Sequence, residues 1–477
     1  MASSTLLLYA RLYGGFNWSH TPLNSTRVRP LTTPPREEGQ LSGKAIITNL
    51  VTEYDGGMLI WRSSFPSRSA TWYDPRVRHQ AMCSLDPQIV DHVARVEQDY
   101  SFRDFFPSTL EPDSRSDLIS LRLISWSFCA AASRHLFKHI VASIDSSVRG
   151  RNTLRRFTGI SRNQYAAHVR YLETGYDHWG LYTSSSLGQN IQDLAGLFSP
   201  CLARLSDLRI LKFRASRQSL TRDQEGTAIK AIVTALRYVN LPHLEGLELF
   251  FPIAHDFGYF FPNHPTPLQI PMEDVLHRLK YLALHVTAYT KQLGQRYWKT
   301  PVLPAHAALP NDLYAAYLFR LVELAPHLEA LRISSTDVLP FYTIHFSPAV
   351  HLTSLCLCRV LITFDHFRAL MEQCRDHLKH IELSLVQLHS GTWYTALTQL
   401  RQLPHLIDFS IYSCGYPDSG PNAHLRGLLP APDDPEPLET MSSADYDGLD
   451  ELRKFVNANR VALGLLPYDR KDSRWSR

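Results

Sequence analysis

APHLEALRI, the stretch from Ala325 to Ile333, has apolar residues at its first, fourth, seventh and ninth positions. This L-x-x-L-x-x-L-x-L pattern, with other residues in place of some leucines, occurs seven times along the chain. The other copies are LSDLRILKF at 205–213, LPHLEGLEL at 241–249, LHRLKYLAL at 276–284, AVHLTSLCL at 349–357, RDHLKHIEL at 375–383 and LPHLIDFSI at 403–411, with a weaker AAHVRYLET at 166–174. Each strong copy ends in the alternation of a short strand. Such self-similarity predicts a solenoid, in which each unit buries its apolar face against its neighbours.

The spacing of the copies indicates the type of solenoid. The last four begin 24, 26 and 28 residues apart, within the roughly 20–29-residue period of leucine-rich repeats. The earlier steps of 39, 36, 35 and 49 residues leave room for longer helices or inserted loops. Helical spacing of apolar residues fills the gaps, in GQNIQDLAGLFSPCLARL, TAIKAIVTALRYV, NDLYAAYLFRLVELA, FDHFRALMEQC and WYTALTQLRQL. We therefore predict an α/β fold: an irregular leucine-rich-repeat solenoid over residues 148–430, with parallel strands on one face and helices on the other.

Length and composition fit such a protein. The chain has 477 residues, 44% of them hydrophobic and 20% charged, which predicts two or three ordinary globular domains. A net charge of +4 gives no basis for expecting a nucleic-acid or membrane partner. Cys356 and Cys358 alternate on one predicted strand and have no second pair to complete a zinc site. We expect reduced thiols, a cytoplasmic or nuclear location, and no metal or other cofactor.

Residues 1–80 are predicted to be a mostly disordered or irregular tail. Its first 36 residues contain four arginines and no acidic residue, and they are rich in Ser and Thr. This is also the composition of a mitochondrial transit peptide, but Gly14, Gly15 and Pro22 interrupt any amphipathic helix of useful length.

A different segment, residues 81–147, is predicted to be a small helical domain. It contains LDPQIVDHVARV at 85–96 and DLISLRLISWSFCAAASRHLFKHIVAS at 117–143. About 60 residues bury such a closely spaced apolar set poorly on their own, which predicts a partner surface.

This segment resembles an F-box. LRLISWSF at 121–128, followed by AASRHLF at 131–137, resembles the second half of that motif, L-R-L-V-S-K-x-F and then A-x-x-x-L-F. LDPQI at 85–89 resembles the first half, L-P-x-E-[IL], with Asp86 inserted and Gln88 in place of the acid. Trp126 replaces a Lys or Arg. With the repeats that follow, the chain is similar to fungal proteins that pair an F-box with irregular leucine-rich repeats.

The resemblance implies a non-catalytic adaptor of a cullin-type (SCF) ubiquitin ligase. The box would bind the adaptor subunit of the ligase, and the repeats would bind an unknown protein substrate. The residues implied in adaptor binding are Pro87, Ile89, Leu118, Leu121, Leu123, Ile124, Phe128, Leu136 and Phe137. Two alternatives stay open: these residues form the core of a cap that seals the first repeat, and the protein is a repeat scaffold without a link to a ligase. No common catalytic motif, such as G-x-S-x-G or H-E-x-x-H, occurs in the chain.

Strand geometry predicts a second binding surface. Because alternate residues share a face, the seventh and ninth positions of each unit enter the core and the eighth points to the concave surface. The eighth positions, expected to be highly exposed, are Lys212, Glu248, Ala283, Arg332, Cys356, Glu382 and Ser410. Lys212, Glu248, Arg332 and Glu382 are the predicted partner contacts, together with Tyr259, Phe260 and Phe261 of an aromatic insertion, FFPIAHDFGYFFPNHPTP at 250–267. The alternative is that these aromatic residues plug a gap in the array.

Two further patterns concern the histidines and the C-terminal segment. His243, His327, His351, His377 and His405 all stand at the third position of their units. This favours a repeat-consensus role where the chain enters each strand, with a metal or proton-transfer role as the alternative. Residues 431–477 are predicted to be an acidic linker and a C-terminal helix, DYDGLDELRKFVNANR, that covers the open end of the solenoid.

Overall fold

The structure is a computed structural model. It describes residues 54–55, 58–59, 112–123, 125–143, 148–175, 186–215, 220–261, 269–291, 302–427 and 436–468. The chain divides into two compact units, Met1–Ala70 and Thr71–Arg477. The described part of the first unit is an antiparallel pair of short strands, β1 (Tyr54–Asp55) and β2 (Met58–Leu59).

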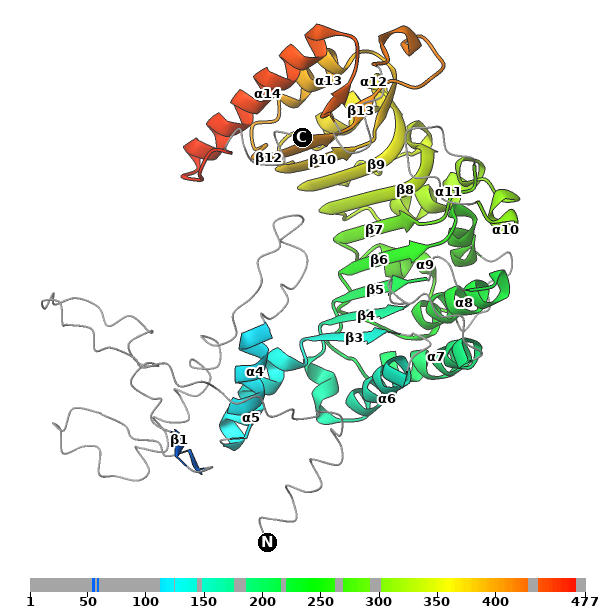
Figure 1. Ribbon diagram of the computed structural model, residues 1–477, viewed down its shortest axis with the longest axis vertical. Helices are drawn as coiled ribbons and strands as arrows, with labels where there is room; N and C mark the ends of the chain where they lie inside the picture. The colour runs from blue at the N-terminus through cyan, green and yellow to red at the C-terminus, as the bar shows by residue number, and fades with distance from the viewer. Residues whose placement is uncertain are drawn as a thin grey trace, which may run out of the picture. The chain divides into compact units, whose positions relative to one another are not determined.

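One twelve-stranded sheet runs through the second unit, and the pairings between its strands are parallel (Figure 1). Its strands are β3 (His139–Ser143), β4 (Tyr171–Gly175), β5 (Ile210–Arg214), β6 (Gly246–Phe251), β7 (Tyr281–Val286), β8 (Ala330–Pro340), β9 (Ser354–Thr363), β10 (His380–Ser384), β11 (Gln387–Ser390), β12 (Asp408–Tyr412), β13 (Cys414–Gly415) and β14 (Leu438–Glu439). From β3 to β9 the strands are neighbours in chain order. The predicted parallel α/β array is confirmed.

Beyond β9 the sheet divides into two branches. The first half of β9 pairs with β10, which pairs with β12, and the second half pairs with β11, which is followed by β13 and β14. Arg359, Leu385 and Ser413 lie at the divide in three successive units and have φ angles of 55°, 57° and 47°. Non-glycine residues seldom adopt positive φ. Their recurrence at one level shows that the chain turns a corner there in these three units.

Helices cover one face of the sheet (Figure 1). They are α6 (Val148–Ser161), α7 (Ser186–Leu202), α8 (Arg222–Tyr238), α9 (Met272–Leu276), α10 (Pro304–Ala307), α11 (Asn311–Glu323), α12 (Phe364–Gln373) and α13 (Trp393–Leu400). Local sequence sets their ends. A reciprocal capping box of Thr221 and Gln224 starts α8, and one of Thr392 and Thr395 starts α13. The five predicted helical stretches all contain helices at these places.

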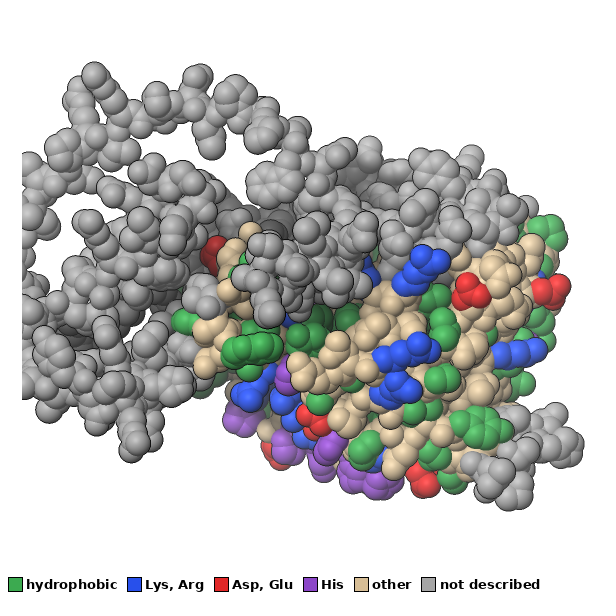
Figure 2. Space-filling view, turned by 90° about the horizontal axis from the view of Figure 1, so that it is seen from below, with side chains coloured by type: hydrophobic (Ala, Val, Ile, Leu, Met, Phe, Trp, Pro, Cys, Tyr) green, Lys and Arg blue, Asp and Glu red, His purple; other side chains and the backbone are tan. Residues whose placement is uncertain are grey.

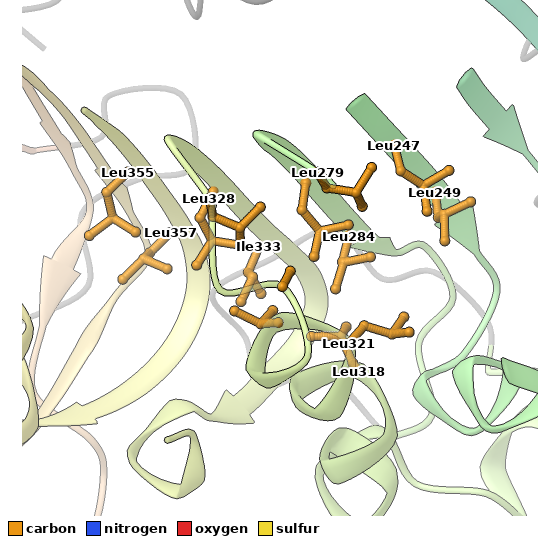
Figure 3. Close-up of a cluster of buried hydrophobic side chains, with 14 of the residues drawn as sticks. Leu247, Leu249, Leu279, Leu284, Leu318, Leu321, Leu328, Ile333, Leu355 and Leu357 are labelled. Atoms are coloured by element: carbon orange, nitrogen blue, oxygen red, sulfur yellow. The ribbon is translucent and has the colours of Figure 1, made fainter. Parts of the chain in front are cut away.

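The core lies between the sheet and the helices (Figure 3). Leu247, Leu249, Leu331, Ile333, Leu355 and Leu357, the seventh and ninth residues of three units, are all 0% exposed. Leu318 and Leu321 of α11 belong to the same core. Each such side chain contributes about 1.5–3 kcal/mol by its burial. The predicted strand register is therefore confirmed.

The sheet extends past the predicted limits of the solenoid, 148 and 430. At its start, HIVAS of the predicted helical domain forms β3 and pairs in register with β4. At its end, β14 pairs with β13. The helix α14 (Ser443–Ala462) follows and packs on α13, with Gly448 against Tyr394. Both ends are extended because a strand or helix added there covers backbone or apolar surface that the last unit leaves open.

A buried asparagine ties together the segments that follow β6 and β7 and the second half of β8. Asn311 is fully buried; its Oδ1 accepts a hydrogen bond from the backbone of Ala254, and its Nδ2 donates to Ala288 O and to Asp337. The sequence pattern lacks the Asn that usually follows the last leucine of such a repeat. Here a residue at the start of α11 satisfies the buried loop groups instead.

Candidate binding surfaces

The first surface is the sheet face opposite the helices, which we call the strand face. Alternate residues share a face, so the sixth, eighth and tenth positions of each unit lie on it. The in-register pairing sets the eighth positions side by side, in the order Glu173, Lys212, Glu248, Ala283, Arg332, Cys356, Glu382 and Ser410. The structure thus brings the four predicted charged residues into one row.

Opposite charges alternate along part of this row. Lys212 Nζ lies 3.9 Å from Glu173 Oε1 and 3.3 Å from Glu248 Oε2. Arg214 Nε lies 3.2 Å from Glu173 Oε1, and His285 Nε2 lies 3.5 Å from Glu248 Oε1. These side chains come from four adjacent strands, where cross-strand pairs of opposite charge are favourable.

An aromatic stack borders these charges. The rings of Phe250 and His285 are 3.8 Å apart between centroids, with an interplanar angle of 1°. The Arg214 guanidinium lies 4.3 Å from the centroid of Phe250. Of these three groups Arg214 is partly exposed, so its guanidinium can also stack on an aromatic side chain of a partner. We call Glu173, Lys212, Arg214, Glu248, Phe250 and His285 the strand-face cluster.

Burial sets the protonation of the cluster. Burial lowers the pKa of His285, so its imidazole is favoured as the neutral form. Burial alone would raise the pKa of Glu248, but the His285 imidazole and the Lys212 ammonium outweigh it and hold that pKa below its ordinary value. Glu248 therefore keeps a carboxylate whose charge Lys212 balances.

A second charged group lies further along the row. Arg332 donates from Nε to Cys356 Sγ at 3.3 Å and from Nη2 to Glu382 Oε2 at 3.4 Å. Burial raises the pKa of the Cys356 thiol well above its ordinary value, which disfavours the reactive thiolate. Arg332 and Glu382 are thus the charged side chains of this group, and Cys356 stays a neutral thiol between them.

The predicted high exposure of the eighth positions is wrong. Glu248, Ala283 and Cys356 are 4%, 0% and 1% exposed, and the other four are partly buried. Neighbouring strands are only about 4.8 Å apart, so long side chains lie across short ones. The ring of Tyr281, for example, packs with Ala283 and Ala330. The prediction also left out Arg214, Phe250 and His285. These residues stand at the tenth position of their units, on the same face of the sheet as the eighth position.

The second surface is a helical hairpin of α4 (Pro112–Leu121) and α5 (Trp126–Leu136). Leu118 and Leu136 are buried in its core with Ala132, and Leu121, Phe128 and Phe137 pack around them. Leu123 is instead 80% exposed. Pro87, Ile89 and Ile124 lie outside the described residues. The predicted adaptor contacts therefore include both core residues and a surface residue.

Two further exposed apolar residues, which are not among the predicted adaptor contacts, lie near Leu123 in sequence. Trp126 is 89% exposed and Ile119 is 50% exposed. Trp126 begins α5, after Ser125 caps the helix by accepting a hydrogen bond from Phe128 N. The Trp at a position where the F-box pattern has Lys or Arg was the feature of the sequence that could have identified this residue.

The hairpin is also anchored to the first units of the sheet. Phe137 stacks on Tyr165 of η2 (Gln164–His168) at 4.4 Å, and Arg122 donates a hydrogen bond to the Tyr165 hydroxyl at 3.2 Å. This contact holds the hairpin beside β3.

The aromatic insertion is mostly core. It forms η3 (Ala254–Phe260), and Phe260 is 0% exposed beside Phe251. Tyr259 and Phe261 are half-buried, under the cations of Lys230 and Arg320 respectively. The prediction of a partner contact is wrong for Phe260, because the ring fills the space between β6 and the helices.

Acid should destabilise the fold through His139. Burial and the charges of Lys212 and Arg115 lower the pKa of His139, which also lies on the strand face, to about 4. Between pH 6.5 and 4 the unfolded chain therefore binds more protons than the folded chain does. The free energy of unfolding should fall by about 1–3 kcal/mol as the pH is lowered through that range. Urea denaturation at pH 7.5 and pH 5 measures the loss, which His139→Gln should reduce. The exposed His243→Gln is the control, and an equal loss in both variants would rule out His139 as the cause.

Comparison with known proteins leaves the family open: no family model and no curated protein matches this chain. In the described part of the chain, no three or more His, Cys, Asp or Glu side chains are placed to hold one metal ion. No described helix combines the length and the apolar character that crossing a membrane requires.

Proposed function

We propose that the chain is a non-catalytic adaptor that binds the adaptor subunit of a cullin-type ubiquitin ligase through the α4–α5 hairpin. The strand face would bind the protein substrate. The observation that carries the proposal is the exposure of Ile119, Leu123 and Trp126 within the F-box-like sequence.

The hairpin has what a docking element needs. Its core of Leu118, Ala132 and Leu136 is separate from the main core. Its exposed Trp126 and Leu123 are therefore not required to hold the solenoid together. Exposed apolar surface marks interaction sites, and Trp is enriched among residues that dominate binding energy.

The strand face supports substrate binding. The repeat register and the parallel sheet favour a leucine-rich-repeat solenoid, whose strands present side chains on a rigid frame. Binding to fixed side chains costs less conformational entropy than binding to mobile loops. The partly exposed side chains of this face, Glu173, Arg214, Arg332 and Glu382, are the substrate contacts in this proposal.

The test uses the full-length protein and the purified adaptor subunit. Leu123→Asp and Trp126→Asp should each weaken binding at least about tenfold, because each places a charge in an apolar contact. The melting temperature should stay unchanged, since both residues are exposed. Leu313→Asp is the matched control, because Leu313 is 73% exposed on α11. If the wild type binds tightly and neither Leu123→Asp nor Trp126→Asp weakens that binding, the hairpin is not the docking element.

The second candidate is a repeat scaffold with no link to a ligase. The stacking of Phe137 on Tyr165 favours it, because a hairpin anchored in this way also seals the first unit. If the wild-type protein fails to bind the adaptor subunit while a known F-box protein binds it, the scaffold is the function that remains.

A further inference from the structure

A row of exposed histidines precedes six adjacent strands, from β6 to β10 and β12. They are His243, His277, His327, His351, His377 and His405. Figure 2 shows histidine side chains gathered close together on one face of the molecule. His277 was not in the predicted set, because it stands at the second position of its unit.

Four of these histidines form two pairs. The rings of His277 and His327 are 4.5 Å apart between centroids, at an interplanar angle of 84°. Those of His351 and His377 are 4.9 Å apart, at 54°. His351 and His377 stand at matching positions of adjacent units, which are separated by the strand spacing of about 4.8 Å. His277 stands one position earlier in its unit than His327 does, and the two rings still meet. Among the described residues, His243 and His405 have no such ring contact with a neighbouring histidine.

We propose that each pair binds one divalent transition-metal ion of the Cu²⁺, Ni²⁺ or Zn²⁺ class. Imidazole nitrogen is a preferred ligand of these ions. Two nitrogens on one ion lie at most about 4 Å apart, since each bond is about 2.0–2.1 Å long. Exposed rings with centroids 4.5 and 4.9 Å apart reach that geometry by side-chain rotation.

The surroundings define the kind of site. Since no group of three or more ligands occurs among the described residues, water completes the coordination. The ion therefore binds less tightly than at a four-ligand structural site, and it remains open to exchange or to a ligand supplied by a partner. The inference is independent of the proposed adaptor function.

The test is a titration of the full-length protein with Cu²⁺, followed by calorimetry and by electron paramagnetic resonance. The double variant His277→Asn/His351→Asn removes one histidine from each pair. It should bind two fewer ions than the wild type and lose the signal of copper bound by two nitrogens.

The matched control is His243→Asn/His405→Asn, which removes two exposed histidines from the same edge of the sheet without breaking a pair. It should bind as many ions as the wild type. Unchanged melting temperatures would show that both double variants fold. Equal stoichiometry in the two double variants would overturn the proposal, whether both match the wild type or both lose ions.

Discussion

Replacing Asp445 with Ala is expected to lower the free energy of unfolding by about 3–5 kcal/mol. Asp445 is 0% exposed in the first turn of α14. Its carboxylate accepts hydrogen bonds from Tyr394 N at 2.8 Å, the Tyr416 hydroxyl at 2.9 Å and Thr440 Oγ1 at 2.7 Å. The truncation leaves three donors without this acceptor, at the point where α13, β13 and α14 meet.

Urea denaturation measures the loss, and limited proteolysis shows whether α14 leaves the sheet first. Asp445→Asn keeps one acceptor oxygen and should cost roughly half as much. Asp447→Ala, at an exposed position of the same helix, should change stability by less than about 0.5 kcal/mol. A similar loss for Asp445→Ala and Asp447→Ala would mean that the hydrogen bonds do not hold the end of the sheet.

Replacing Phe260 with Ala should cost about 3–5 kcal/mol, as for other fully buried aromatic residues. Its ring packs against Phe251, which in turn contacts Phe257 and Phe213 of the core. Truncation therefore opens a cavity between β6 and the helices.

Tyr259→Ala, one residue earlier, is the matched comparison. Tyr259 is half-buried, so its truncation should cost less than about 1.5 kcal/mol. Chemical denaturation of both variants decides the point. Equal, small losses in the two variants would mean that the insertion is a surface loop and not part of the core.

The sequence predicted the strand register because the register depends on local alternation. Leu247 and Leu249 had to share a face whatever their neighbours were. The exposure of the other face was not predictable in this way. Glu248 is buried because Lys212 and His285 flank it from adjacent strands that are 36 and 37 residues away in sequence.

The candidate hairpin shows the same limit. The F-box-like pattern selected Leu118 and Leu123 together, but the pattern does not say which side chain faces the core. The turn after α4 leaves Leu123 exposed while Leu118 is buried. Only the packing of α5 against α4 separates the two roles.

The pairing of charges in the strand-face cluster has a consequence for association. Glu173, Lys212, Arg214 and Glu248 already satisfy one another across β4, β5 and β6. A partner that binds there exchanges existing ion pairs for new ones and adds little net attraction at long range. Because added salt screens both the old and the new pairs, complex formation at this face should depend only weakly on ionic strength.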